Sequence, residues 1–261
     1  MTSGKRRALG QHFLRDAGIA RAIVDLVAPT RADLVVEIGP GEGALTVLLA
    51  ERAGRLIALE IDHALIERLR ARVPAAELIE ADARRWDYAS LVRPVGGRVL
   101  VVGNLPYSVG KPILQALVEA GAALDRMALM LQLEVADRVA AAPGGKTYGA
   151  LSVLTQLHWD VRVALRVPPG AFRPPPKVDS AVLELRPLRA PRVELADERR
   201  FQAVVRAAFA QRRKTLANAL AAGLGLSVAG VRAAAAAGGI DPGRRAETLD
   251  IKEFAELARR L

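Results

Sequence analysis

The chain has 261 residues, of which 51% are hydrophobic and 25% charged, a composition typical of a soluble globular protein with one or two domains. Lysine and arginine outnumber aspartate and glutamate by 38 to 28, which favours a polyanionic partner such as nucleic acid. The counts are 23 basic against 20 acidic residues up to Leu185 and 15 against 8 after it, so the tail is the basic part. The alternative explanation is an arginine-rich composition with a solvated surface.

Several kinds of chemistry are disfavoured by what the sequence lacks. With no cysteine there is no disulfide, thiolate nucleophile or cysteine zinc site. The three histidines, His12, His63 and His158, are far apart in sequence, so no metal site is expected. No apolar run approaches the roughly 18 to 20 residues of a membrane span, and no signal-type segment follows the basic N-terminus, so we expect a cytoplasmic protein.

The N-terminal region combines a basic arm with an amphipathic helix. Lys5, Arg6 and Arg7 precede the segment Gly10-Gln11-His12-Phe13-Leu14, and Asp16 is placed to cap a helix. That helix carries apolar residues at helical spacing, namely Ile19, Ile23, Leu26 and Val27.

A strand, a glycine turn and a helix follow. Residues 34–38 predict a strand, Gly39-Pro40-Gly41-Glu42-Gly43 a turn, and residues 44–52 a helix, an order that brings backbone close to a nucleotide-like ligand. The spacing Gly-x-Gly-x-Gly departs from the dinucleotide fingerprint Gly-x-Gly-x-x-Gly and argues against NAD. Glu37, just before the turn, suits a cationic ligand better than a pyrophosphate.

Acidic side chains end the next two strands. Glu60 closes the strand 55–61 about 20 residues after the glycine turn, where a carboxylate commonly accepts from both ribose hydroxyls. After a helix over 63–72, Asp82 closes the strand 77–82 and is placed to accept from the exocyclic amine of an adenine. Each acid taken alone also fits a solvated loop.

The fourth strand, 99–102, leads through Gly103 into Asn104-Leu105-Pro106-Tyr107-Ser108. Carboxyl ends of strands in open α/β sheets usually hold ligands. Asn104 offers a side-chain acceptor, Leu105 a backbone carbonyl, and Pro106 stiffens the turn and removes a donor. Tyr107 adds a flat aromatic face. Such a site suits a planar group with an exocyclic amine, for which adenine is the obvious candidate, although this sequence is also ordinary turn chemistry.

The remainder of the first domain alternates helices and strands. Helices are predicted over 111–121, 134–142 and 148–157, and strands over 127–133, 161–167 and 178–185. The last two strands flank a proline-rich connection, 168–177, that presents Phe172 between Arg173 and other basic residues such as Lys177. An aromatic on a stiff basic loop can stack on a displaced base. The alternative is that Phe172 packs beneath the loop.

Residues 187–191 predict a linker, and the pattern is helical beyond it. Helices are expected over 201–211, 215–222, 228–237 and 251–261. Arg212, Arg213 and Lys214 form a cationic cluster between the first two, suited to phosphate contact or to a solvated junction. We therefore expect an α/β domain at 1–186 with a mostly parallel, Rossmann-like sheet, and a small helical, basic, RNA-binding domain at 187–261.

Together these motifs resemble the ribosomal RNA adenine N6-dimethyltransferases, most closely the bacterial small-subunit members. The resemblance covers nearly the whole chain. Five segments carry it in order: Gly10 to Leu14, Glu37 to Gly43, Asn104 to Tyr107, Phe172 to Ser180, and Phe209 to Lys214.

The resemblance implies an S-adenosylmethionine-dependent enzyme without a metal. The cofactor would be held by His12, Leu14, Gly39, Gly41, Glu60, Asp82 and Asn104. The catalytic residues would be Asn104, Leu105, Pro106, Tyr107 and Phe172. The RNA would contact Lys5, Arg6, Arg7, Arg173, Lys177, Arg212, Arg213 and Lys214. Position 12 is often asparagine in the family, so the role of His12 is the weakest of these assignments.

The implied substrate is a pair of adjacent adenosines in the terminal hairpin of 16S rRNA within a precursor of the small subunit, and a monomer is expected. Three alternatives stay open: a 23S rRNA adenine methyltransferase of the resistance type, a DNA adenine methylase, and a non-catalytic assembly or transcription factor.

Overall fold

The computed structural model describes residues 12–261, so Lys5, Arg6 and Arg7 of the expected basic arm lie outside the described residues. The described residues form two compact units: residues 12–136 with 160–187, and residues 137–159 with 188–261. None of the helices within 12–261 is both long and apolar enough to span a bilayer.

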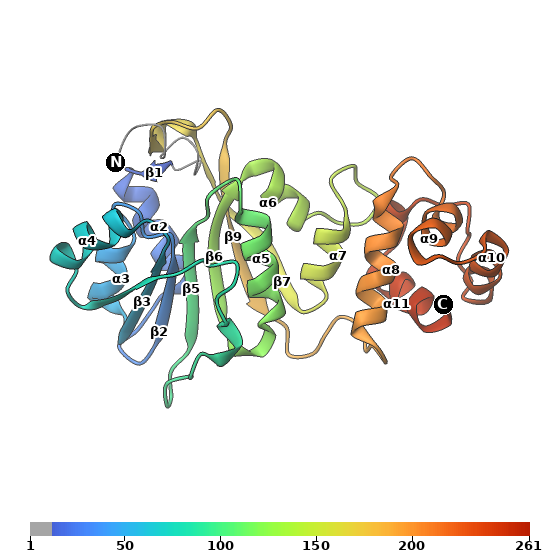
Figure 1. The fold of residues 1–261 in the computed structure, drawn as a ribbon, viewed down its shortest axis with the longest axis horizontal. Coiled ribbons are helices and arrows are strands. Elements are labelled where there is room, and N and C mark those ends of the chain that lie inside the picture. Colours follow the sequence, from blue (N-terminus) through green and yellow to red (C-terminus); the bar gives the residue numbers. More distant parts are fainter. Residues whose placement is uncertain (1–11) are drawn as a thin grey trace. The chain divides into compact units, whose positions relative to one another are not determined.

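The first unit is built on a seven-stranded sheet with the strand order β4-β3-β2-β5-β6-β9-β7 (Figure 1). The pairings among β2 to β6 are parallel, whereas β9 runs antiparallel to β6. The expected mostly parallel sheet is thus confirmed. The strands are β2 (Leu34–Ile38), β3 (Arg55–Glu60), β4 (Ala76–Glu80), β5 (Val99–Asn104), β6 (Arg126–Gln132), β7 (Trp159–Val167) and β9 (Ser180–Pro187).

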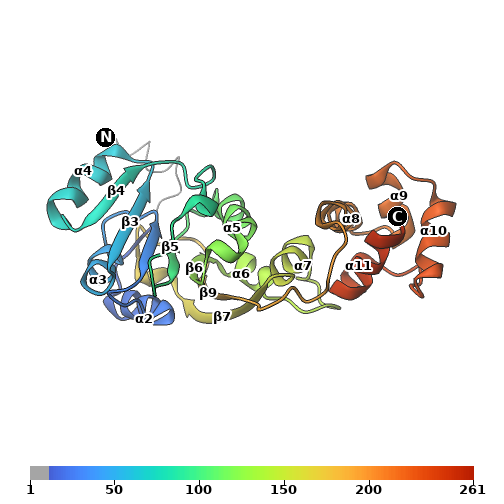
Figure 2. The ribbon, with the colours of Figure 1, turned by 90° about the horizontal axis from the view of Figure 1, so that it is seen from below.

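Helices cover both faces of this sheet, which explains why β2 is buried along its whole length and is apolar at every position except Glu37. One face packs against α2 and α3 in a single apolar cluster, and Figure 2 shows α5 across the sheet from α2. The helices of this unit are α2 (Ala17–Val27), α3 (Thr46–Arg52), α4 (His63–Arg72) and α5 (Gly110–Glu119), with short 3-10 turns η1 (Tyr88–Ser90), η2 (Gly121–Ala123) and η3 (Pro169–Ala171). As expected, Asp16 caps α2 by accepting from the backbone of Gly18 and Ile19.

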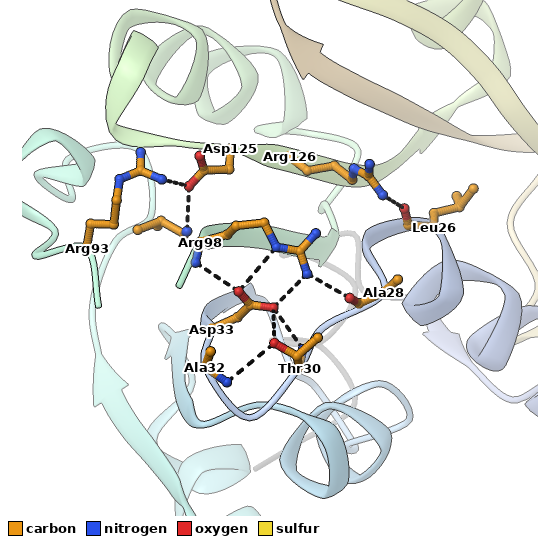
Figure 3. A network of polar contacts seen from close by, with 10 residues as sticks. Leu26, Ala28, Thr30, Ala32, Asp33, Arg93, Arg98, Asp125 and Arg126 are labelled. Atoms are coloured by element: carbon orange, nitrogen blue, oxygen red, sulfur yellow. Dashed lines mark hydrogen bonds and ion pairs between the residues drawn. The ribbon is translucent and has the colours of Figure 1, made fainter. Parts of the chain in front are cut away.

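Two arginines, Arg98 just before β5 and Arg126 at the start of β6, hold the C-terminal end of α2 (Figure 3). Arg126 donates to the carbonyl of Leu26 at 3.0 Å, and Arg98 donates to the carbonyl of Ala28 at 2.9 Å. The guanidinium of Arg98 also binds the buried carboxylate of Asp33 at 2.7 Å. Cations at this position satisfy carbonyls that the helix leaves unpaired, so this network fixes α2 against the sheet.

A second, two-stranded sheet joins the N-terminal segment to the proline-rich connection. β1 (Phe13–Leu14) pairs antiparallel with β8 (Phe172–Arg173), with Leu14 opposite Phe172. The backbone N–H of Arg15 extends this pairing to the carbonyl of Ala171 at 2.8 Å. Segments about 160 residues apart in sequence are therefore held side by side.

The second unit is helical and has its own apolar core. It contains α7 (Ala150–Gln156), α8 (Glu198–Ala210), α9 (Leu216–Leu224), α10 (Val228–Ala237), η4 (Ala246–Thr248) and α11 (Ile251–Arg260). α6 (Leu133–Val139) begins in the first unit and ends in the second. The expected division at 186/187 lies one residue before the boundary in the structure, which falls at 187/188, and it placed residues 137–159 in the first domain, whereas they belong to the second unit. The reason is packing: Tyr148, Val153 and Leu157 are buried in the same core as Phe201.

Candidate functional site

A cavity of about 150 Å³ opens where β4, β3, β2 and β5 reach their carboxyl ends. Because these four strands are neighbours, residues that follow them meet at one edge of the sheet. The cavity lining includes Gly39, Gly41, Glu60, Asp82 and all of Asn104 to Tyr107. The structure therefore brings the sequence motifs of four strands into one space.

The glycine turn after β2 supplies open backbone at the cavity wall. Gly39 and Gly41 have φ of +66° and +56°, a conformation that glycine adopts without strain. A Cβ on Gly41 would lie 2.9 Å from the ring of Phe13, so only hydrogen fits there. The turn therefore packs closely against Phe13 and places the backbone of Gly39 and Gly41 at the cavity wall.

Glu60 is a buried carboxylate at this edge. Its Oε1 accepts from the backbone N–H groups of Ile61 and Asp62 at 2.9 and 3.0 Å, and its Oε2 from that of Gly41 at 3.3 Å. Burial raises the pKa of Glu60, and these three hydrogen bonds oppose the shift. The single, longer contact to Oε2 leaves that oxygen with capacity to accept from a ligand hydroxyl.

Asp82 lies across the cavity and is already engaged. Arg84 donates to both of its oxygens at 2.6 to 3.1 Å, and both side chains line the cavity. The hydrogen bond from Arg84 lowers the pKa of Asp82 to about 2, so this group is a carboxylate at neutral pH. A ligand amine that binds Asp82 must share it with Arg84.

Glu37 does not reach the cavity, so it is not placed to contact a cationic ligand there, contrary to what the sequence suggested. It is 1% exposed within β2 and is absent from the cavity lining. Burial, with a smaller contribution from the charge of Glu60, raises the pKa of Glu37 to about 8. The carboxyl group is thus largely protonated at pH 7 and is part of the sheet beneath the glycine turn.

The amide of Asn104 has a fixed orientation. Its Nδ2 donates to the carbonyl oxygen of His12 at 2.8 Å, and a carbonyl can only accept, so the NH₂ group must face His12. The side-chain oxygen Oδ1 is left as the acceptor. Leu105, whose side chain is buried, follows it on the cavity wall.

Tyr107 stands on a closed turn beside these acceptors. The N–H of Val109 donates to the carbonyl of Pro106 at 3.1 Å, closing the turn. The phenol oxygen of Tyr107 is hydrogen-bonded to the buried hydroxyl of Ser180, and its ring centroid lies 5.3 Å from that of His12. Burial raises the pKa of Tyr107. The ring is therefore held as a neutral aromatic wall.

The N-terminal segment contributes backbone and ring atoms. His12 lines the cavity, and its Nδ1 lies 2.7 Å from the carbonyl of Pro174, so this nitrogen carries a hydrogen. Leu14 is buried in the apolar cluster against α2 and is not among the residues that line the cavity.

A stacking role for Phe172 does not fit its position. The side chain is 2% exposed, lies in the apolar cluster with Leu14 and Ala171, and is not part of the cavity lining. The next residue of β8, Arg173, faces the opposite side of the strand and is exposed. The alternation of a strand buries one residue and exposes the next, and here it places the aromatic inside.

Of the predicted RNA-binding residues in the first unit, neither Arg173 nor Lys177 is among the residues that line the cavity. Arg173 and Lys177 are exposed on the proline-rich connection. In the second unit, Arg212, Arg213 and Lys214 are exposed in the turn after α8, and Arg212 also donates to the carbonyl of Lys146.

The cavity lining also includes residues that were not predicted from the sequence, among them Phe13, Ile61 and Arg84. Ile61 carries a signal that could have been used, since it is an apolar residue between Glu60 and Asp62 at the end of a strand. It is 52% exposed at the cavity. Among residues 12–261, no group of three or more His, Cys, Asp or Glu side chains is arranged to hold a metal ion.

The family model described as ribosomal RNA adenine dimethylase matches residues 2–261. The chain belongs to this family. A ribosomal RNA small subunit methyltransferase A from Geobacter metallireducens is 48% identical over 97% of this chain and 94% of its own length. One of the same name from Acidobacterium capsulatum is 47% identical over 99% and 92%.

Solved structures of the family share the fold. A dimethyladenosine transferase from Plasmodium falciparum is 25% identical with a TM-score of 0.77, covering 94% of this chain and 96% of its own. The 23S rRNA methyltransferase ErmE is 28% identical with a TM-score of 0.69, covering 95% and 99%.

Proposed function

We propose that this protein transfers methyl groups from S-adenosylmethionine to N6 of two adjacent adenosines in the terminal hairpin of 16S rRNA, two methyl groups to each. The observation that carries the proposal is that Gly39, Glu60, Asp82 and the segment Asn104 to Tyr107 line one cavity. Membership of the rRNA adenine dimethylase family supports the reaction, and the names of relatives that are 43–48% identical support the small subunit as the source of the substrate.

The cavity fits the cofactor. Glycine backbone at Gly39 and Gly41 permits close approach, the Oε2 atom of Glu60 is placed to accept from a ribose hydroxyl, and Asp82 from the adenine amine. Ile61, exposed between them, offers an apolar surface for the adenine ring. When bound, S-adenosylmethionine supplies a methyl group that is already strongly electrophilic on its sulfonium sulfur.

The protein has to orient the target amine because adenine N6 is a poor nucleophile whose lone pair is delocalised into the ring. We assign the two acceptors for the N6 hydrogens to Oδ1 of Asn104 and the backbone carbonyl of Leu105. Accepting both hydrogens directs the lone pair toward the methyl group. Alignment of reactants is worth about 7–11 kcal/mol, so the mechanism needs no strong base, and the proton leaves to water after transfer.

Tyr107 provides the stacking surface for a base that has left its helix. Its hydroxyl is bonded to Ser180 and its ring packs beside His12, so the ring is held in place before the base arrives. In the second transfer N6 carries one hydrogen and one methyl group. One acceptor is then unused, and the cavity must admit the added methyl.

The test is the Asn104→Ala variant. We expect the methylation rate on unmethylated small subunits to fall by about 100- to 1000-fold, the cost typical of removing one preorganised hydrogen-bonding group. Binding of S-adenosylhomocysteine, measured by calorimetry, should remain detectable. Gln115→Ala is the matched control, because it removes an amide of similar size from α5 outside the cavity lining.

Mass spectrometry of rRNA from a deletion strain locates the methyl groups. Complementation with the wild-type gene should restore dimethyladenosine in small-subunit RNA, and Asn104→Ala should not. Full dimethylation by Asn104→Ala would remove this residue from the mechanism, and methyl groups found only in large-subunit RNA would overturn the proposed substrate.

A further inference from the structure

A cluster of three arginines surrounds one buried carboxylate at the far end of the sheet. Glu184, on β9, is 1% exposed. Its Oε1 lies 2.7 Å from Nη2 of Arg186 and 3.8 Å from Nε of Arg126, and its Oε2 contacts Arg162 of β7. We call these four residues the Glu184 arginine cluster.

The cluster carries an excess of positive charge. Three guanidinium groups face one carboxylate, which leaves two charges uncompensated among these four residues. The consequence is visible at Arg126, whose pKa is lowered by burial and by the positive charge of Arg186, with smaller contributions from Arg98 and Arg162. An anion placed against the cluster would relieve this repulsion.

The excess charge is accessible to solvent. The side chains of Arg162 and Arg186 are 56% and 53% exposed, whereas that of Arg126 is 25% exposed. Arg126 is also tied to the carbonyl of Leu26 (Figure 3). Arg126 and Glu184 thus form a fixed support beneath the surface. The guanidinium groups of Arg162 and Arg186, which both contact Glu184, are held close together at the surface.

This surface is separate from the catalytic cavity. Leu100 of β5 pairs with Arg126, whereas Asn104, at the other end of β5, pairs with Met130. Four residues along a strand correspond to about 13 Å. The cavity and the cluster therefore lie toward opposite ends of the strands of the same sheet, and one nucleotide cannot occupy both.

We propose that the Glu184 arginine cluster is a second RNA contact, in which Arg162 and Arg186 bind backbone phosphates of the substrate outside the nucleotides that enter the cavity. The guanidinium fork matches a phosphate in two parallel hydrogen bonds, and phosphate contacts position RNA without reading its sequence. The choice of RNA rests on the proposed function. Two adjacent guanidinium groups match the repeated phosphates of an RNA chain better than a single carboxylate side chain.

The experiment measures binding to full-length 16S rRNA as the salt concentration rises. The variant R162Q/R186Q removes two charges but keeps side chains that can donate to Glu184. Each phosphate contact contributes about 0.7 to 0.9 to the logarithmic salt slope. On a fourfold increase in salt, wild-type affinity should therefore fall about 7- to 12-fold more than that of the variant.

Two further variants separate position from bulk charge and from folding. R55Q/R70Q removes two arginines of similar exposure, 58% and 61%, that pair with Glu77 and Glu67 on the first unit. It should retain the wild-type salt slope. R162K/R186K keeps both charges and should retain most of the binding. An unchanged affinity for S-adenosylhomocysteine in each variant shows that the first unit is folded.

The results decide the proposal independently of methylation. An unchanged salt slope in R162Q/R186Q, or an equal loss in R55Q/R70Q, would overturn it. A short hairpin RNA that enters only the cavity should be bound equally by the wild type and R162Q/R186Q. Failure of the wild type to methylate small-subunit RNA would instead contradict the proposed function, while the salt slopes would still report on the cluster.

Discussion

Phe172 and Tyr107 are two aromatic side chains with opposite environments. Phe172 is buried in the apolar cluster, whereas Tyr107 lines the cavity. We expect Phe172→Ala to lower the free energy of unfolding by about 3–5 kcal/mol, as for other buried phenylalanines. Phe172→Leu should cost about 1.5 kcal/mol or less, because it nearly preserves volume. Urea denaturation measures both changes.

The activity of Phe172→Leu tests the catalytic assignment. The folded Phe172→Leu variant should methylate at close to the wild-type rate. Tyr107→Leu should reduce the rate and should also lower the free energy of unfolding by about 1–3 kcal/mol, because it leaves the buried hydroxyl of Ser180 without its partner. A large fall in kcat for Phe172→Leu at an unchanged free energy of unfolding would show that Phe172 contacts the substrate.

The candidate site also shows which features of a site can be predicted from the sequence and which cannot. Glu60, Asp82 and Asn104 were each predicted at the end of a strand, and the structure brings them to one cavity. The environment of Phe172 was not predictable, since it depends on pairing with Leu14 about 160 residues earlier. A local pattern reports which residues are near in sequence, and it does not report which segment covers them.

The same distinction holds for helices and strands. The strand 34–38 and the helices 63–72 and 228–237 were predicted with the bounds that the structure has. Each is marked by a local signal, such as the four apolar residues among the five of β2 or the Asp62 cap of α4. The N-termini of α3 and α7 lie two residues later than predicted, whereas their C-termini agree within one residue. Neither N-terminus has a side-chain cap in the structure to mark it in the sequence.

The loop between α2 and β2 depends on Asp33. Its buried carboxylate accepts from Thr30 and from the backbone and guanidinium of Arg98. Burial alone would raise the pKa of Asp33, but these hydrogen bonds outweigh it and hold the pKa well below its ordinary value of 3.8. The folded protein is therefore stabilised by the charged form of Asp33.

We expect Asp33→Asn to lower the free energy of unfolding at pH 7 by about 1.5–3 kcal/mol, the usual value of hydrogen bonds to a charged group. Because the folded pKa is depressed, this contribution is present above the unfolded value of 3.8 and is lost as pH falls toward the folded pKa. Denaturation curves of wild type and variant should thus converge in acid. A difference that stays constant from pH 7 to pH 2.5 would contradict this account.

At the scale of the whole molecule, the sequence indicated two parts but not how the chain divides between them. The second unit takes residues 137–159 from the middle of the chain. Their apolar pattern predicts a helix, yet nothing local tells which core that helix joins. The cavity, by contrast, is lined only by residues of the first unit, which is why motifs within one domain were sufficient to locate it.

The separation of the two units leads to a last prediction, for Arg212, Arg213 and Lys214. These residues belong to the second unit and are exposed. The variant R212Q/R213Q/K214Q should bind 16S rRNA more weakly, with a salt slope reduced by up to about 2–3. Its affinity for S-adenosylhomocysteine should be unchanged, because the cavity lies in the first unit. A matched control is R199Q/R206Q/R232Q, three exposed arginines of the second unit. Equal losses in both would show that the total charge of the unit, rather than this cluster, binds the RNA.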